Sequence, residues 1–142
     1  MNLQARIEHF FTLGEVFLNP KNQSLQKAQQ MAFQQNAWFL PEFQEYAIHQ
    51  IRDTYLNATA LENWVHQYPQ LSMAPTGKKI GIVMAGNIPL VGFHDLLSTL
   101  IAGHTAVVKL SSKDSVLMQW VIEALNKINP VSYTHLTLPT KA

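Results

Sequence analysis

The sequence of 142 residues contains no cysteine. The chain itself therefore offers neither a disulfide nor a thiolate nucleophile. Charged residues make up only 13% of the sequence, about half the share usual in soluble domains, and their signs nearly balance at a formal charge of +1. So small a net charge gives no indication of binding to nucleic acid or to an anionic membrane surface.

Long apolar runs and amino-terminal targeting features are also missing. No run reaches the ~18 apolar residues that a membrane-spanning helix needs. The amino terminus has no basic start followed by an apolar segment, and Glu8 and His9 interrupt it. We therefore predict a protein without a membrane span or a secretory signal, located in the cytoplasm.

Residues 131–142 resemble the translation of a transposase adapter used in DNA sequencing, and we interpret them as read-through. A natural β-rich tail is the alternative, because apolar and polar residues roughly alternate from 131 to 138. Lys141 is the only charged residue of this tail, so the rest of the chain is formally neutral. On this interpretation the natural protein continues beyond Pro130, and the nucleophile of that longer parent stays open.

Residues 1–74 have the pattern of a helical leader. Thr59 to Glu62 have the spacing of a capping box, which predicts the start of the last helix. The aromatic residues Trp38, Phe39, Phe43 and Trp64 are interpreted as core. Apolar residues recur at helical spacing in four segments, which are 3–17, 24–36, 41–55 and 59–68.

Residues 75–130 predict an α/β fold. Two β-branched runs, 80–85 and 105–110, read as strands buried on both faces. Between them a helix is predicted to start near Pro89 and to end at a left-handed Gly103. Ser111 or Ser112 is expected to cap a final helix, with Asp114 in its first turn.

The resulting order of strand, helix, strand and helix with short loops implies parallel strands. The fold class is therefore a helical leader followed by a truncated βαβα part of a Rossmann-like parallel sheet.

Ligands of such folds bind beyond the carboxyl ends of the strands. The first strand is followed by Ala85-Gly86-Asn87-Ile88-Pro89, which is not the GxGxxG turn of common dinucleotide sites. The second ends in Lys109 and is followed by Ser111 and Ser112. Taken alone, these residues suit ordinary roles, with Lys109 as a solvated lysine and the serines as helix caps. For Asn87 the spacing alone favours a turn residue.

The pattern Gly-Asn-Ile-Pro-Leu after the first strand, with Ala-Gly-His-Thr-Ala-Val-Val-Lys-Leu-Ser-Ser before the last helix, resembles the aldehyde dehydrogenase superfamily. It is most similar to the acyl-CoA reductase branch, which includes the fatty-acid reductases of bacterial bioluminescence. The resemblance is specific over residues 78–114 and weaker over residues 36–39 and the helix that follows them.

The resemblance implies an NAD(P)H-dependent reductase that forms an aldehyde from an acyl thioester through a cysteine acyl-enzyme. That cysteine is not in this chain, so the chain alone is expected to be inactive. Asn87 is implied as the oxyanion donor, since the matching amide of the superfamily donates to the oxygen that becomes negative. Lys109, Ser111 and Ser112, with Ala85 and Gly86, are implied as cofactor-binding residues.

The cofactor is expected to be NADPH, with NADH also possible. Much of the superfamily has a Glu three residues after the strand-end lysine, where an acid binds ribose hydroxyls and repels a 2′-phosphate. The corresponding residue here is Ser112, which can donate a hydrogen bond to phosphate.

The expected partner is an acyl-CoA or another acyl thioester, and a homo-oligomeric parent is left open. No metal is predicted, because His94 and His104 lack metal-ligand spacing. Two other functions remain open, namely a nucleotide-binding α/β module without redox chemistry and a non-catalytic helical scaffold.

Overall fold

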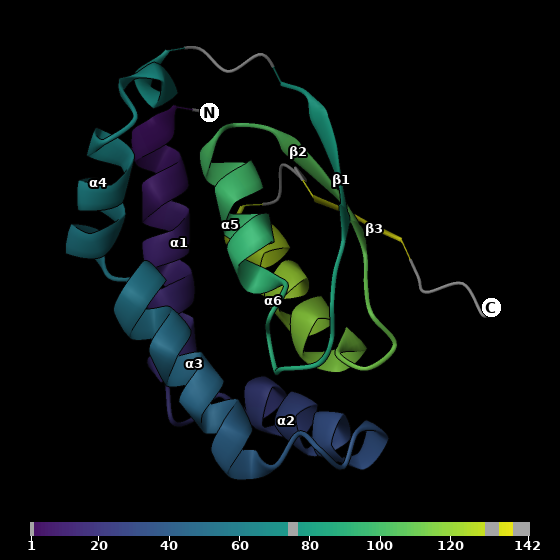
Figure 1. Ribbon diagram of the computed structural model, residues 1–142. Coiled ribbons are helices and arrows are strands. Elements are labelled where there is room, and N and C mark those ends of the chain that lie inside the picture. The colour runs from purple at the N-terminus through teal and green to yellow at the C-terminus, as the bar shows by residue number, and fades with distance from the viewer. Residues whose placement is uncertain (1, 74–76, 130–133, 138–142) are drawn as a thin grey trace.

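The computed structural model of the protein describes residues 2–73, 77–129 and 134–137. It is helix-rich, and a small parallel sheet lies at one side of the helices (Figure 1). The leader contains α1 (Leu3–Leu18), α2 (Gln23–Gln35), α3 (Pro41–Tyr55), α4 (Ala58–His66) and the short 3-10 helix η1 (Pro69–Ser72). The second part contains β1 (Lys79–Val83), α5 (Phe93–Ile101), β2 (Thr105–Lys109), α6 (Ser115–Ile128) and β3 (Thr134–Thr137).

The alternation of strands and helices agrees with the predicted α/β class, while the assignment to a Rossmann-like sheet stays a prediction. The expected boundary at residue 75 lies outside the described residues, as does most of the tail from residue 131. Among the helices that the structure describes, none has the length and apolar character needed to cross a membrane. The division into two parts and the location in the cytoplasm also stay predictions.

Asparagine side chains set the starts of three leader helices. Asn2, Asn22 and Asn57 each accept a hydrogen bond from the backbone N–H three residues further on. α4 begins directly after Asn57, so the predicted start at Thr59 is wrong. Asn57 provides a better-placed acceptor, since its Oδ1 lies 2.7 Å from the Ala60 nitrogen.

β2 is the central strand of the sheet and pairs in parallel with β1 and with β3. Val83 lies opposite Lys109, so β1 and β2 end at the same edge. The parallel pairing predicted for the first two strands is confirmed. β3 comes from residues 134–137, inside the segment interpreted as adapter. Its pairing agrees with the β-rich alternative, and the adapter origin stays a prediction.

The helices cover one face of the sheet. α5 and α6 lie between the strands and the leader helices (Figure 1). Ile82 and Val108 are buried on the covered face, whereas Val83 on the other face is 81% exposed. The prediction that β1 is buried on both faces is therefore wrong for the described part of the chain, where a second layer of helices is missing.

α5 starts later than predicted. Pro89 lies in a turn, and the helix begins at Phe93. The turn contains Leu90, whose φ of 61° is left-handed and incompatible with an α-helix. The other end agrees with the prediction. Gly103 has a φ of 86°, and its N–H and the next one bond back to the last turn at 3.0 and 3.2 Å, which is a Schellman motif.

The leader and the sheet part share one hydrophobic core. Phe10 of α1, Phe39 before α3 and Phe93 of α5 are all fully buried in it. The rings of Phe10 and Phe93 meet edge to face, with centroids 6.4 Å apart. Buried Arg6 donates from Nε to the Ile101 carbonyl at 3.0 Å. α1 is thus fixed to α5, and the leader holds the start of the sheet part in place.

Candidate functional site

The loops that follow β1 and β2 meet at one edge of the sheet. The Met84 N–H donates to the Lys109 carbonyl at 3.0 Å, which extends the strand pairing beyond β1. Gly86 then packs so closely against Ser111 that a Cβ would overlap the serine Oγ, so a glycine is required here. The structure thus brings Gly86 and Ser111, two predicted cofactor residues, into contact, with exposed Ala85 beside them.

Asn87 is exposed in the turn between β1 and α5. A hydrogen bond from the Val91 N–H to the Ile88 carbonyl, 3.2 Å long, closes this turn. Pro89 and Leu90 in the same turn are buried. Within the described part of the chain the Asn87 amide makes no hydrogen bond. Its N–H groups are therefore available to a ligand, as an oxyanion donor requires.

An apolar cavity of about 600 Å³ lies between α3 and the turn that carries Asn87. One wall is formed by residues 87–91 together with Phe93 and His94. The other wall is α3 and the residues before it, namely Trp38, Phe39, Phe43, Tyr46, Ala47, Gln50, Ile51 and Tyr55. Asn87 therefore places a polar amide at the wall of a mostly aromatic and aliphatic cavity.

Two aromatic residues that were predicted to lie in the core line this cavity instead. Trp38 is 85% exposed and Phe43 is 54% exposed, so the prediction is wrong for both. Phe39 is buried as predicted, and Trp64 packs partly buried against the core. Helical spacing predicts which residues share a face, but it does not distinguish a core contact from a cavity wall.

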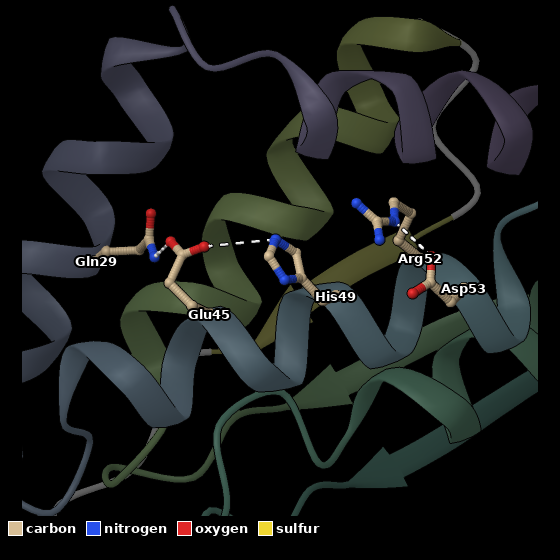
Figure 2. A network of polar contacts seen from close by, with 5 residues as sticks. All are labelled: Gln29, Glu45, His49, Arg52 and Asp53. Carbon is tan, nitrogen blue, oxygen red and sulfur yellow. Dashed lines mark hydrogen bonds and ion pairs between the residues drawn. The ribbon is translucent and has the colours of Figure 1, made fainter.

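A different face of α3 carries the polar contacts drawn in Figure 2. Glu45 accepts a hydrogen bond from Gln29 of α2 at 2.8 Å and lies 3.6 Å from His49 Nε2. Further along the helix, Arg52 Nε and Asp53 Oδ1 are 2.6 Å apart. Exposed ion pairs of this kind add little stability. The contact between Gln29 and Glu45 nevertheless joins α3 to α2, and the cavity side of α3 carries no charged residue.

The second loop exposes cations and a hydroxyl at the end of β2. Lys109, Ser112 and Lys113 are all exposed. Ser111 is half-buried, and its Oγ accepts a hydrogen bond from the Lys113 N–H at 3.2 Å. The prediction that Ser111 or Ser112 caps the last helix is wrong, because Asp114 occupies the N-cap position of α6.

Asp114 turns away from its own helix. Its Oδ2 accepts a hydrogen bond from the Leu90 N–H at 2.7 Å, and its side chain is only 3% exposed. It makes no capping bond to α6, and it precedes the helix rather than lying in its first turn as predicted. Burial raises the pKa of the Asp114 carboxyl to about 7, while the hydrogen bond from Leu90 acts in the opposite direction.

The two histidines considered for the site lie in different surroundings. The His94 ring lies at the cavity, 5.4 Å from the ring of Tyr55 and 6.3 Å from that of Trp64. His104 has its Nδ1 buried without a hydrogen-bond partner in the described part. The described residues contain no group of three side chains placed to hold a metal ion. The absence of a metal site stays a prediction.

Asp114, Leu90 and the α3 wall of the cavity are the parts of this site that sequence reasoning missed. The contact between Asp114 and Leu90 joins residues 24 positions apart, and no local spacing rule indicates such a pair. The sequence does place an aspartate just before an apolar helix, where aspartate normally caps that helix. This position could have drawn attention to Asp114, but not to its contact with Leu90. For the aromatic residues of α3, no signal in the sequence distinguishes residues that line a cavity from residues of the core.

Comparison with known proteins gives one result that bears on identity. The family model described as acyl-CoA reductase (LuxC) matches residues 21–138, which include α2 to α6 as well as β3. A search of curated proteins gave no match. The family match covers both loops of the site, the cavity and most of the leader. Because it extends over most of the chain, this protein belongs to the acyl-CoA reductase (LuxC) family.

Proposed function

We propose that the chain is the amino-terminal part of an NAD(P)H-dependent reductase that converts an acyl thioester into an aldehyde. The observation that carries this proposal is the position of Asn87, an exposed amide at the wall of an apolar cavity. An acyl thioester has the matching two parts, an apolar chain and a carbonyl oxygen. The resemblance to the aldehyde dehydrogenase superfamily supports the same assignment.

The apolar cavity suits the hydrocarbon part of the substrate. Its α3 wall presents Phe43, Tyr46, Ala47 and Ile51, none of them charged. Each methylene group removed from water contributes about 0.8 kcal/mol to binding, so a cavity of this lining favours an apolar acyl group over a short polar one. Asn87 would then mark the carbonyl end of the bound chain.

Asn87 acts, on this proposal, on the oxygen of the acyl group. A cysteine thiolate from the part of the parent beyond Pro130 attacks the carbonyl carbon, and the negative charge collects on the oxygen. The Asn87 N–H donates a hydrogen bond to that oxygen, and free CoA leaves as the acyl-enzyme forms. An amide serves this role because it donates without a charge that would hold substrate and product equally well.

The loop after β2 carries donors that suit the phosphate groups of NADPH. Lys109 and Lys113 supply positive charge, and Ser112 supplies a hydroxyl, all exposed at one sheet edge. Asp114, the nearest acid, is turned inward to Leu90 and does not oppose a 2′-phosphate. We propose that this loop holds the adenosine end of NADPH, in the manner of a Rossmann-like sheet. The bound cofactor supplies the hydride that reduces the acyl group.

The test uses the full-length product of the gene from which this chain derives. With an acyl-CoA and NADPH we expect aldehyde and free CoA in equal amounts, one of each for every NADPH consumed. A thiol-blocking reagent should abolish the reaction. The matched control is the 142-residue chain, which lacks a thiol and should form no aldehyde.

A folded full-length protein that forms no aldehyde with either NADPH or NADH would contradict the proposal. The two alternative functions, a nucleotide-binding module and a helical scaffold, both predict that no aldehyde forms. Nucleotide binding without reduction would favour the module, and absence of both would favour the scaffold.

A further inference from the structure

The Asp114 carboxyl group accepts a hydrogen bond from a distant backbone N–H rather than from its own helix. Residues at the N-cap position usually accept an N–H from the first turn of the helix they precede. Asp114 instead accepts the Leu90 N–H at 2.7 Å, and its side chain makes no capping bond to α6. Its second oxygen, Oδ1, is buried without a partner in the described part of the chain. In this arrangement the Asp114 side chain gives no capping bond to α6, and its Oδ1 is removed from water. These losses indicate that the contact with Leu90 has a role of its own.

The group that Asp114 holds lies in the turn that carries Asn87. Leu90 has a φ of 61°, a left-handed conformation that residues with a Cβ rarely adopt. Conformations of this kind persist where surrounding contacts impose them, and they gather at functional sites. Leu90 is buried, so without Asp114 its N–H would lose its hydrogen-bond partner inside the protein.

The Asn87 side chain depends on this backbone for its position. It makes no hydrogen bond of its own within the described part of the chain. The place from which it reaches a ligand is therefore set by the backbone of the turn, which the Leu90 anchor holds. Misplacing a reacting group by about 1 Å can cost a hundredfold in rate, so an anchor three residues away is close enough to matter.

The loop that contains Asp114 is itself fixed on two sides. Asn36, just after α2, donates from Nδ2 to the Lys113 carbonyl at 3.1 Å. On the other side, Ser111 packs directly against Gly86. The anchor therefore belongs to a set of contacts that joins the leader, the loop after β2 and the turn after β1.

We propose that Asp114 is a positioning residue, which holds the turn so that Asn87 points at the reacting oxygen. The inference rests on the proposed function, because it takes Asn87 as the donor. Asp114 touches neither substrate nor cofactor on this account.

Kinetics of the full-length protein test the proposal. Asp114→Ala removes the acceptor and should lower kcat at least about tenfold, with the KM values of thioester and cofactor changed less than about threefold. Asp114→Asn keeps an acceptor oxygen and should retain kcat within about threefold. Asp95→Ala, at an exposed acid of α5, is the matched control and should behave as the parent.

A double variant separates positioning from general damage. In the Asn87→Ala background no donor remains to be misplaced, so Asp114→Ala should lower kcat by less than about threefold. A tenfold loss that persists in this background would show that Asp114 acts through something else. A folded Asp114→Ala protein with the kcat of the parent would also overturn the proposal.

Hydrogen exchange tests the anchor independently of activity. In the unmutated protein the Leu90 amide should exchange at least about tenfold more slowly than the exposed turn amide of Ile88. Equal rates would overturn the positioning role whether or not any variant folds. If the full-length protein reduces no thioester, the proposed function fails, while the exchange result still tests whether the Leu90 amide is held in the folded turn.

Discussion

Ser112 is the single residue on which we expect the choice of cofactor to depend. It is exposed in the loop after β2, three positions beyond Lys109, where the aldehyde dehydrogenase resemblance implies a glutamate. Ser112→Glu places a negative charge where the 2′-phosphate is expected and should lower the ratio of kcat/KM for NADPH over NADH. Steady-state kinetics with both cofactors measure this ratio. Ser72→Glu, in η1, should leave it unchanged.

The cofactor prediction fails in two cases. A full-length protein that uses NADH alone would exclude the proposed role of this loop. A ratio that does not move in a folded Ser112→Glu protein would mean that Ser112 does not face the ribose.

Asp114 should make the stability of the protein depend on pH. Burial raises its pKa to about 7 in the folded state, above the ordinary value near 3.8. Between these values the folded protein holds a proton that the unfolded chain has released. The free energy of unfolding contributed by this group is therefore full below pH 4 and is lost as pH rises through about 7. The loss is of the order of a few kcal/mol, at about 1.4 kcal/mol per pKa unit.

Urea unfolding of the full-length protein between pH 4 and pH 8 measures this dependence. Asp114→Asn cannot titrate, so its stability should fall less over the same range. Equal slopes for the parent and the variant would contradict the raised pKa of Asp114.

The positions of site residues along the chain's strands and loops were easier to predict from the sequence than the contacts between residues. Asn87 and Lys109 lie at the strand exits where the βαβ pattern predicts them. Asp114 was expected in the first turn of a helix. Its actual partner lies 24 residues earlier, and only the packing of two loops brings them together.

At the scale of elements, the cavity depends on the distance between α3 and the Asn87 turn. Ala47 lines it, whereas His49 belongs to the polar contacts of a different face of α3. Ala47→Trp fills the cavity and should lower kcat/KM for long-chain acyl-CoA at least about tenfold, with less effect on acetyl-CoA. His49→Trp is the matched control and should leave the preference unchanged.

The measurement is a series of kcat/KM values for acyl-CoA substrates of increasing chain length. If Ala47→Trp and His49→Trp have the same profile as the parent, the acyl chain does not enter this cavity. The assignment of Asn87 as oxyanion donor would then lose the support of the cavity.

Element types were predictable from periodicity, but starts and faces were less so. The start of α5 was misplaced because Pro89 is favourable at the first position of a helix. The left-handed Leu90, which delays the helix to Phe93, follows from tertiary contacts with Asp114. β1 was expected to be buried on both faces because its residues are apolar, yet burial depends on which helices are present to cover it.

At the scale of the whole molecule, helices cover one face of the sheet in the part of the chain that the structure describes. Val83 on the open face is 81% exposed. Parallel sheets are normally covered on both faces, so this surface should attract other apolar groups. The purified 142-residue chain should therefore bind an apolar dye and associate, while circular dichroism shows its helices.

Sedimentation and dye fluorescence check this expectation, with the full-length protein as the control. A monomeric 142-residue chain that binds no dye and unfolds in one sharp transition would contradict it. The folded chain would then be stable with its sheet face open.

The central claim is that Asn87 donates a hydrogen bond to the reacting oxygen, and the turnover of Asn87→Ala in the full-length protein tests it most directly. Losing one oxyanion donor costs roughly 10²–10³ in rate, so kcat should fall by that factor while the KM for the cofactor changes little. Circular dichroism and thermal unfolding must show that the variant is folded, because Asn87 also lies in a turn. A folded variant that turns over at the rate of the parent would contradict the claim and leave Asn87 as a turn residue.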